Sequence, residues 1–123
     1  MIRVSPEEFD AIIAQALDSI PAHLRPYLEN VLIEAAETPD PRLLEADDLP
    51  EDLLGLYIGA SIENAAAGDG PLLPDRVLIF RRNLCEMCES REELADEIRI
   101  TVLHEIGHHF GLDEEALDEL GYG

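Results

Sequence analysis

The sequence is poor in positive charge. It contains no lysine, and 8 arginines face 28 aspartates and glutamates, which gives a formal net charge of −20 at pH 7. A surface of this sign repels phosphate backbones and anionic lipids, so nucleic-acid binding and attachment to acidic membranes are excluded as functions. Solubility is the simplest explanation of the acidity, and a preference for basic substrates is the alternative.

Long apolar runs are also missing. No stretch is long enough to cross a bilayer. Residues 1–8 lack the basic region and the apolar core of a signal peptide, so we expect a cytoplasmic protein.

Cysteine is rare as well. Cys85 and Cys88 form a single C-x-x-C, which is half of a structural zinc site and lacks a thioredoxin-like setting. We expect reduced thiols at a strand end or in a loop, with a regulatory disulfide or an accessory metal site as alternatives.

What is present indicates one folded domain. The chain has 123 residues, of which 46% are apolar, enough for a real core. Ser5-Pro6-Glu7-Glu8 and Ser90-Arg91-Glu92-Glu93 each carry a serine cap followed by a glutamate at the third position. They predict a helix ending at Pro21 and a longer one over residues 91–110, whose apolar stripe is Leu94, Ile98, Val102 and Ile106, widened by Leu103 and Phe110.

Strands are predicted between these helices. Apolar and β-branched residues indicate strands over residues 30–37, 53–61 and 75–84. We predict a short helical turn over residues 22–28 and a last short helix over residues 114–120. Loops are predicted over residues 42–52 and 62–74, and the first of them has room for a turn of helix. For Arg81 and Arg82 we prefer a salt bridge over contact with a substrate carboxylate.

The chemistry is concentrated in residues 104–114, which read H-E-I-G-H-H-F-G-L-D-E. On a helix, positions i and i+4 share a face, so His104 and His108 aim two imidazoles at one point. Glu105 lies beside them, where it can hold a metal-bound water as general base. Zinc suits this role because it lowers the pKa of bound water from about 15.7 to about 7. The alternative is a helix with a solvated polar face.

The motif also predicts a third metal ligand. Gly111 allows a sharp turn, and the residue three positions later in the longer H-E-x-x-H-x-x-G-x-x pattern is Glu114. A carboxylate oxygen is an acceptable zinc ligand. Asp113 competes for this position, but it is also suited to cap the last short helix, so we prefer Glu114.

The chain resembles the minimal zincin-like metallopeptidase family of short bacterial proteins. The resemblance extends over almost the whole chain and is carried by residues 104–114, residues 98–103, residues 57–61, Leu117 and the Leu120-Gly121 ending. It implies one domain over residues 1–123 with an α+β fold, in which a small mixed sheet of three to four strands packs against the N-terminal helix and the H-E-x-x-H helix. It also implies a zinc-dependent protease. Met1 and Met87 both precede the motif, so the chain lacks the Met-turn of metzincins.

These observations predict a zinc-dependent peptidase that acts on a peptide or protein. His104, His108 and Glu114 would bind Zn²⁺, and Glu105 would take the proton of the attacking water. His109 and Tyr122 are candidates for a second oxyanion donor, and an exposed edge of the second or third strand could bind the substrate. The alternative function is a non-catalytic zinc-binding or interaction module with an acidic surface.

Overall fold

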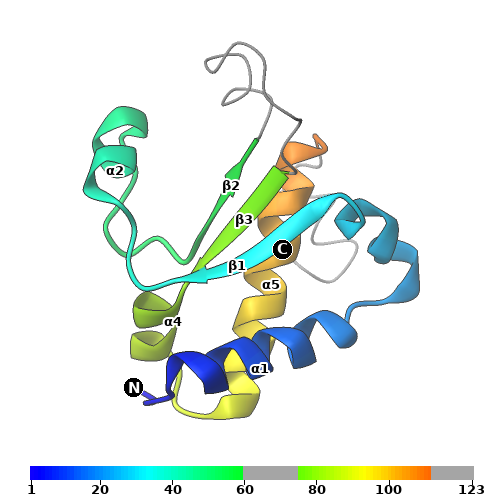
Figure 1. Cartoon of the computed structure of the whole chain (residues 1–123), viewed down its shortest axis with the longest axis horizontal. Coiled ribbons are helices and arrows are strands. Elements are labelled where there is room, and N and C mark those ends of the chain that lie inside the picture. Colours follow the sequence, from blue (N-terminus) through cyan, green and yellow to red (C-terminus); the bar gives the residue numbers. More distant parts are fainter. Residues whose placement is uncertain (60–74, 112–123) are drawn as a thin grey trace.

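The computed structural model describes residues 1–59 and 75–111, without the side chain of Asp47. Three strands form one mixed sheet, β1 (Val31–Ala36), β2 (Gly55–Ile58) and β3 (Asp75–Phe80). Helix α5 (Arg91–His109) packs against β2 and β3, and α1 (Pro6–Asp18) packs across α5 (Figure 1). The predicted α+β fold is therefore confirmed.

The two long helices begin where the sequence predicts. The hydroxyl oxygen of Ser5 accepts a hydrogen bond from the Glu8 N–H at 3.1 Å, and that of Ser90 accepts one from the Glu93 N–H, also at 3.1 Å. Each bond satisfies an amide that the first helical turn leaves without a partner. Helix α1 ends at Asp18, slightly before the predicted end, and a 3₁₀ helix, η1 (Ala22–Leu28), follows it.

The strand order is β1-β3-β2, so β3 is the central strand. β1 runs parallel to β3 and β2 runs antiparallel to it. In the part of the chain that is described, β2 has β3 on one side and no strand on the other. The prediction left the second and third strands open as the exposed edge, and the structure assigns that position to the second, β2.

Two helices differ from the predictions. Helix α2 (Pro41–Asp47) occupies much of the expected loop over residues 42–52, because the Asp40 carboxylate caps it by accepting from the Arg42 N–H at 2.9 Å. The third strand was predicted to reach Leu84, which is wrong, since β3 ends at Phe80 and α4 (Arg81–Met87) begins at once.

The expected position of one cysteine is corrected too. Cys85 lies on α4 rather than at a strand end or in a loop, whereas Cys88 follows α4 as its C-cap residue, in the segment before α5. Both are buried free thiols. Helical spacing turns them into the core together with Leu84, which a strand would not do.

The core lies between the sheet, α1 and α5. Its fully buried members come from all of these elements and include Phe9, Val77, Ile79, Leu94, Ile98 and Val102. Burial of one such side chain contributes about 1.5–3 kcal/mol to stability. The predicted stripe of α5 is confirmed except at Phe110, which follows the helix and is 49% exposed against the ring of Tyr27.

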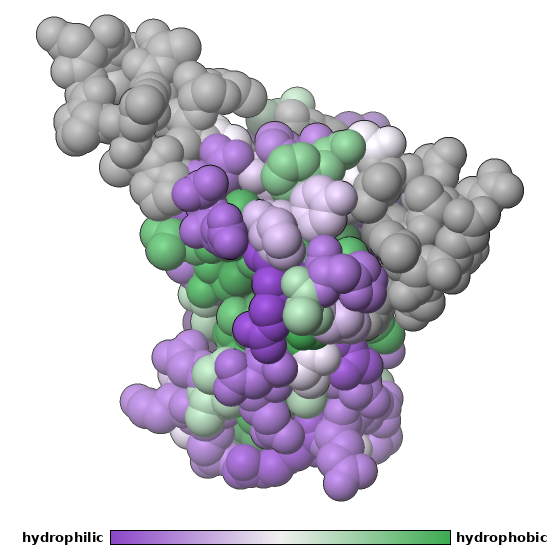
Figure 2. Space-filling model, turned by 90° about the vertical axis from the view of Figure 1, so that its right-hand side faces the viewer, coloured by the Kyte–Doolittle hydropathy of each residue, from purple (hydrophilic) through white to green (hydrophobic). Residues whose placement is uncertain are grey.

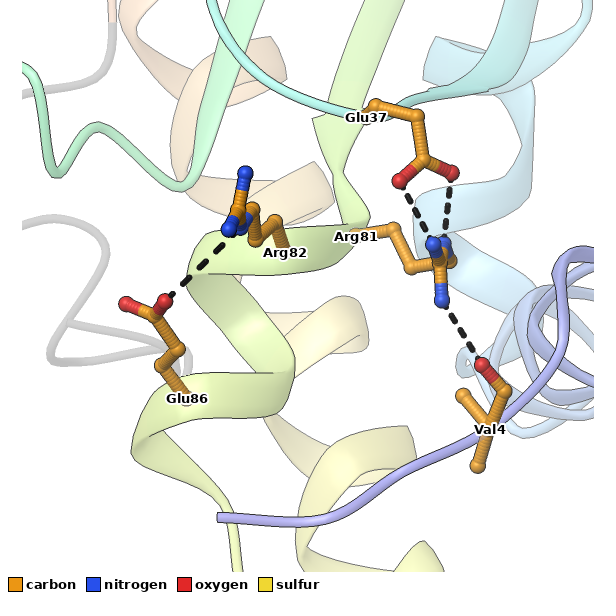
Figure 3. Close-up of polar contacts among 5 residues, drawn as sticks. All are labelled: Val4, Glu37, Arg81, Arg82 and Glu86. Atoms are coloured by element: carbon orange, nitrogen blue, oxygen red, sulfur yellow. Dashed lines mark hydrogen bonds and ion pairs between the residues drawn. The ribbon is translucent and has the colours of Figure 1, made fainter.

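Arg81 ties three segments together at the start of α4 (Figure 3). Its Nε and Nη2 donate to the two carboxylate oxygens of Glu37, just after β1, at 2.6 and 2.5 Å, and its Nη1 donates to the Val4 carbonyl at 2.7 Å. This bidentate bond holds the pKa of Glu37 below its ordinary value. Nε of Arg82 lies 4.0 Å from Oε1 of Glu86. The predicted salt bridge is confirmed.

The surface is mainly hydrophilic on the side drawn in Figure 2, above all in its lower part. Green apolar patches lie higher on this side. Among residues 1–59 and 75–111, no helix is both long and apolar enough to cross a membrane.

Candidate metal centre

The two motif histidines lie side by side near the C-terminal end of α5. The ring centroids of His104 and His108 are 4.4 Å apart, with an angle of 35° between the ring planes. His104 is half-buried and His108 is exposed. Four residues on a helix return to the same face, so the two rings can offer nitrogen ligands to one ion.

Glu105 connects this pair to the sheet. One oxygen of its carboxylate, Oε1, accepts a hydrogen bond from the Tyr57 main-chain N–H on β2 at 3.3 Å. Burial raises the pKa of Glu105, against the lowering effects of the Tyr57 bond and of His104 and His108. A raised pKa makes the carboxylate a better proton acceptor at neutral pH than an exposed glutamate.

The Tyr57 N–H is available because of the strand register. The Phe80 N–H donates a hydrogen bond to the Leu54 carbonyl at 3.0 Å, so Leu54 is a hydrogen-bonded position of the ladder with β3. Every second residue after it, Leu56 and Ile58, is then also a hydrogen-bonded position. Alternation along an antiparallel ladder then turns the main-chain groups of Gly55 and Tyr57 away from β3, towards the open edge. The carboxylate of Glu105 therefore lies at the open edge of β2.

A second polar cluster surrounds Tyr57. Its hydroxyl donates to Asp75 Oδ2 at 2.6 Å, and its ring stacks on that of His109, with centroids 4.0 Å apart and 11° between the planes. His109 Nε2 lies 3.7 Å from the same Asp75 oxygen. Burial and the Asp75 carboxylate both raise the pKa of Tyr57.

This cluster was not found by sequence reasoning. Tyr57 and Asp75 lie far from the motif in sequence, and no local spacing connects them to it. His109, a predicted candidate for an oxyanion donor, packs on Tyr57 beside Asp75. We infer that it supports the strand edge.

The predicted metal set is described in part. Glu114, the competing Asp113 and the candidate donor Tyr122 lie outside the described residues. Within residues 1–59 and 75–111, no group of three or more histidines, cysteines and carboxylates is placed to hold a metal. The Cys85–Cys88 pair thus has no third ligand in this part of the chain, and burial raises the pKa of the Cys88 thiol to about 11.

Comparison with known proteins extends these observations. Residues 28–123 match the model of a family described as zincin-like metallopeptidase. A solved structure of a conserved hypothetical protein from Thermo thermophilus has a similar fold, with a TM-score of 0.52 at 18% sequence identity over 94% of this chain and 99% of that one. No curated protein matches the sequence. The family match covers most of the chain, including the H-E-x-x-H helix, and the chain therefore belongs to the zincin-like metallopeptidase family.

Proposed function

We propose that the protein is a zinc-dependent peptidase. The observation that carries this proposal is the meeting of three groups at one place: the paired imidazoles of His104 and His108, the half-buried carboxylate of Glu105, and the open edge of β2. Zinc-dependent hydrolysis of a peptide bond needs the metal ion, a proton acceptor and a surface that orients the substrate main chain. The chain offers candidates for all three.

The donor set fits zinc. Two imidazole ligands on one helical face are a common part of catalytic zinc sites, and the proposed third ligand, Glu114, would complete three protein ligands. Bound zinc would supply a Lewis acid that acidifies water and polarises the scissile carbonyl. His104 and His108 would each bind it through a neutral ring nitrogen.

The residues of the chain divide the remaining work. Glu105 would accept a proton from the attacking water at its carboxylate and pass it to the leaving amine. A peptide can bind by adding a strand to β2, using the outward main-chain groups of Gly55 and Tyr57. In that arrangement the Tyr57 N–H would bond to the substrate, which would release Glu105 from its present hydrogen bond.

The alternative is a zinc-binding module without turnover. It is favoured by the same Glu105–Tyr57 bond, since this bond helps to hold α5 against β2. Here the acidic surface would dock a basic partner, and Glu105 would be structural. The two functions differ in what they require of Glu105: a proton acceptor in the first, a hydrogen-bond acceptor in the second.

Substitution of Glu105 separates them. Glu105→Gln keeps an amide oxygen that can accept the Tyr57 N–H, but it cannot take a proton at neutral pH. For a peptidase, we expect the zinc-loaded Glu105→Gln variant to retain zinc and fold while hydrolysis of a quenched-fluorescent peptide library falls by about 10²–10⁴-fold. Glu92→Gln, an exposed change on the same helix, is the control.

Two results would decide against the peptidase. If Glu105→Gln hydrolyses peptides at the wild-type rate, the assignment of the general base is wrong. If the wild type binds zinc and hydrolyses no peptide of the library, the module without turnover is the better account.

A further inference from the structure

A pocket of about 340 Å³ begins at His104 and Glu105 and continues along α5 towards its N-terminal end. The walls are largely apolar. Leu53 and Leu54, just before β2, form one wall, and Ile100 on α5 contributes to the other. We call this cavity the Leu53 pocket. Since it opens directly beside the proposed catalytic residues, a side chain held in it would belong to a residue close to the bond that is cleaved.

Close contact between β2 and α5 shapes the pocket. A Cβ atom on Gly55 would lie 2.6 Å from Thr101 Cγ2, so only glycine lets the strand approach the helix this closely. Both residues line the pocket. A peptide paired with the open edge of β2 would point alternate side chains towards α5, and one of them would enter the Leu53 pocket.

Besides Glu105 at its catalytic end, two more carboxylates interrupt the apolar lining. Asp52 is exposed before β2 and Glu97 is half-buried on α5. Neither forms an ion pair or a side-chain hydrogen bond with another residue of the described segments 1–59 and 75–111. No arginine lines the pocket. Beyond Glu105, the cavity therefore combines an apolar wall with the negative charges of Asp52 and Glu97, which have no positive partner there.

Lysine and arginine match this combination. Their aliphatic stems cover apolar surface while the charged end stays near solvent and near an anion. A neutral apolar side chain would fill the walls but leave the carboxylates without a partner, and an acidic one would be repelled. We propose that the Leu53 pocket binds a lysine or arginine side chain of the substrate, next to the scissile bond, through Asp52 and Glu97. This proposal rests on the proposed function.

The test measures binding, independently of turnover. The probes are three short peptide hydroxamates, whose hydroxamate binds zinc, with lysine, norleucine or glutamate as the adjacent residue. They are titrated calorimetrically into the zinc-loaded full chain. We expect lysine to bind about tenfold more tightly than norleucine, and glutamate to bind most weakly, because two partly exposed carboxylates act on one charge. The lysine preference should shrink in 1 M salt.

The variant Asp52→Asn/Glu97→Gln should bind lysine and norleucine probes about equally, while Glu92→Gln should keep the preference. Equal zinc-dependent affinity for all three probes in the wild type, or a preference for norleucine that the double variant leaves unchanged, would overturn the pocket assignment and leave the zinc site intact. Failure of every probe to bind the zinc-loaded chain would instead contradict the proposed function and, with it, this inference.

Discussion

The contact between β2 and α5 depends on Gly55, and replacing this residue tests how closely the two elements pack. In Gly55→Ala the new methyl group would meet Thr101 Cγ2 at 2.6 Å and the Leu78 carbonyl oxygen at 3.1 Å. The first distance is far below van der Waals contact, and both neighbours are held in place, one on a buried turn of α5 and the other in β3. The strand must therefore move away from the helix.

The expected cost follows from overpacking. Extra methyl groups in a packed interior cost about 1–3 kcal/mol. For a chain of 123 residues, the entropy of unfolding is about 0.26 kcal/mol/K, so this loss lowers Tm by roughly 4–12 °C. Gly59→Ala is the matched control, because a Cβ there has no described atom within 4 Å. Its stability should be unchanged or slightly higher.

Urea unfolding followed by circular dichroism measures the free energy of unfolding of both variants, Gly55→Ala and Gly59→Ala. Thr101→Ser removes the Cγ2 methyl that causes the shorter contact, so Gly55→Ala should cost less in that background than in the wild type. Some cost should remain, because the Leu78 carbonyl is still near. Equal losses for Gly55→Ala and Gly59→Ala, or an unchanged cost after Thr101→Ser, would refute this packing.

Three further predictions concern the core and the charged surface. Ile98→Ala, at a fully buried position, should lower the free energy of unfolding by about 2–5 kcal/mol in the same urea assay. Arg81 lowers the pKa of Glu37 in the folded protein. The ionised Glu37 therefore stabilises the fold above the pKa that it has in the unfolded chain, and this stabilisation is lost as the pH falls through its pKa in the folded protein. Glu37→Gln should then lose stability at pH 7, and its difference from the wild type should shrink as the pH falls below the ordinary pKa of a glutamate. Cys88, with its thiol pKa raised to about 11 by burial, should resist iodoacetamide at pH 8 in the folded protein and react after unfolding.

Local signals accounted for the elements that carry their own caps. Ser5 and Ser90 predict the starts of α1 and α5, because a serine hydroxyl followed by a glutamate three residues later can accept a main-chain N–H of the first helical turn. The whole signal lies within one short segment. Helix α4 has no such signal: its cap position is Phe80, which makes no side-chain capping bond, so no capping residue separates β3 from the helix. Asp40-Pro41 is also a helix-start signal, for α2, but the prolines and acidic residues of that region favoured the prediction of a loop.

One part of the candidate metal centre follows from local sequence, and the other depends on how the sheet packs. The spacing of His104 and His108 is enough to place both rings on one face, since only the helix is needed. The contact of Glu105 with Tyr57 joins residues 48 positions apart and depends on which strand lies at the sheet edge. Strand order is decided by the packing of the whole sheet on α5, which no local pattern contains.

The metal content of the purified, zinc-loaded protein tests directly whether His104 and His108 on α5 bind zinc. We expect about one zinc per chain, lost in both His104→Ala and His108→Ala and kept in His23→Ala, which changes an exposed histidine on η1. Circular dichroism would establish that all variants are folded. A wild type that takes up no zinc would rule out the site, and folded His104→Ala and His108→Ala variants that both keep zinc would show that these histidines are not its ligands.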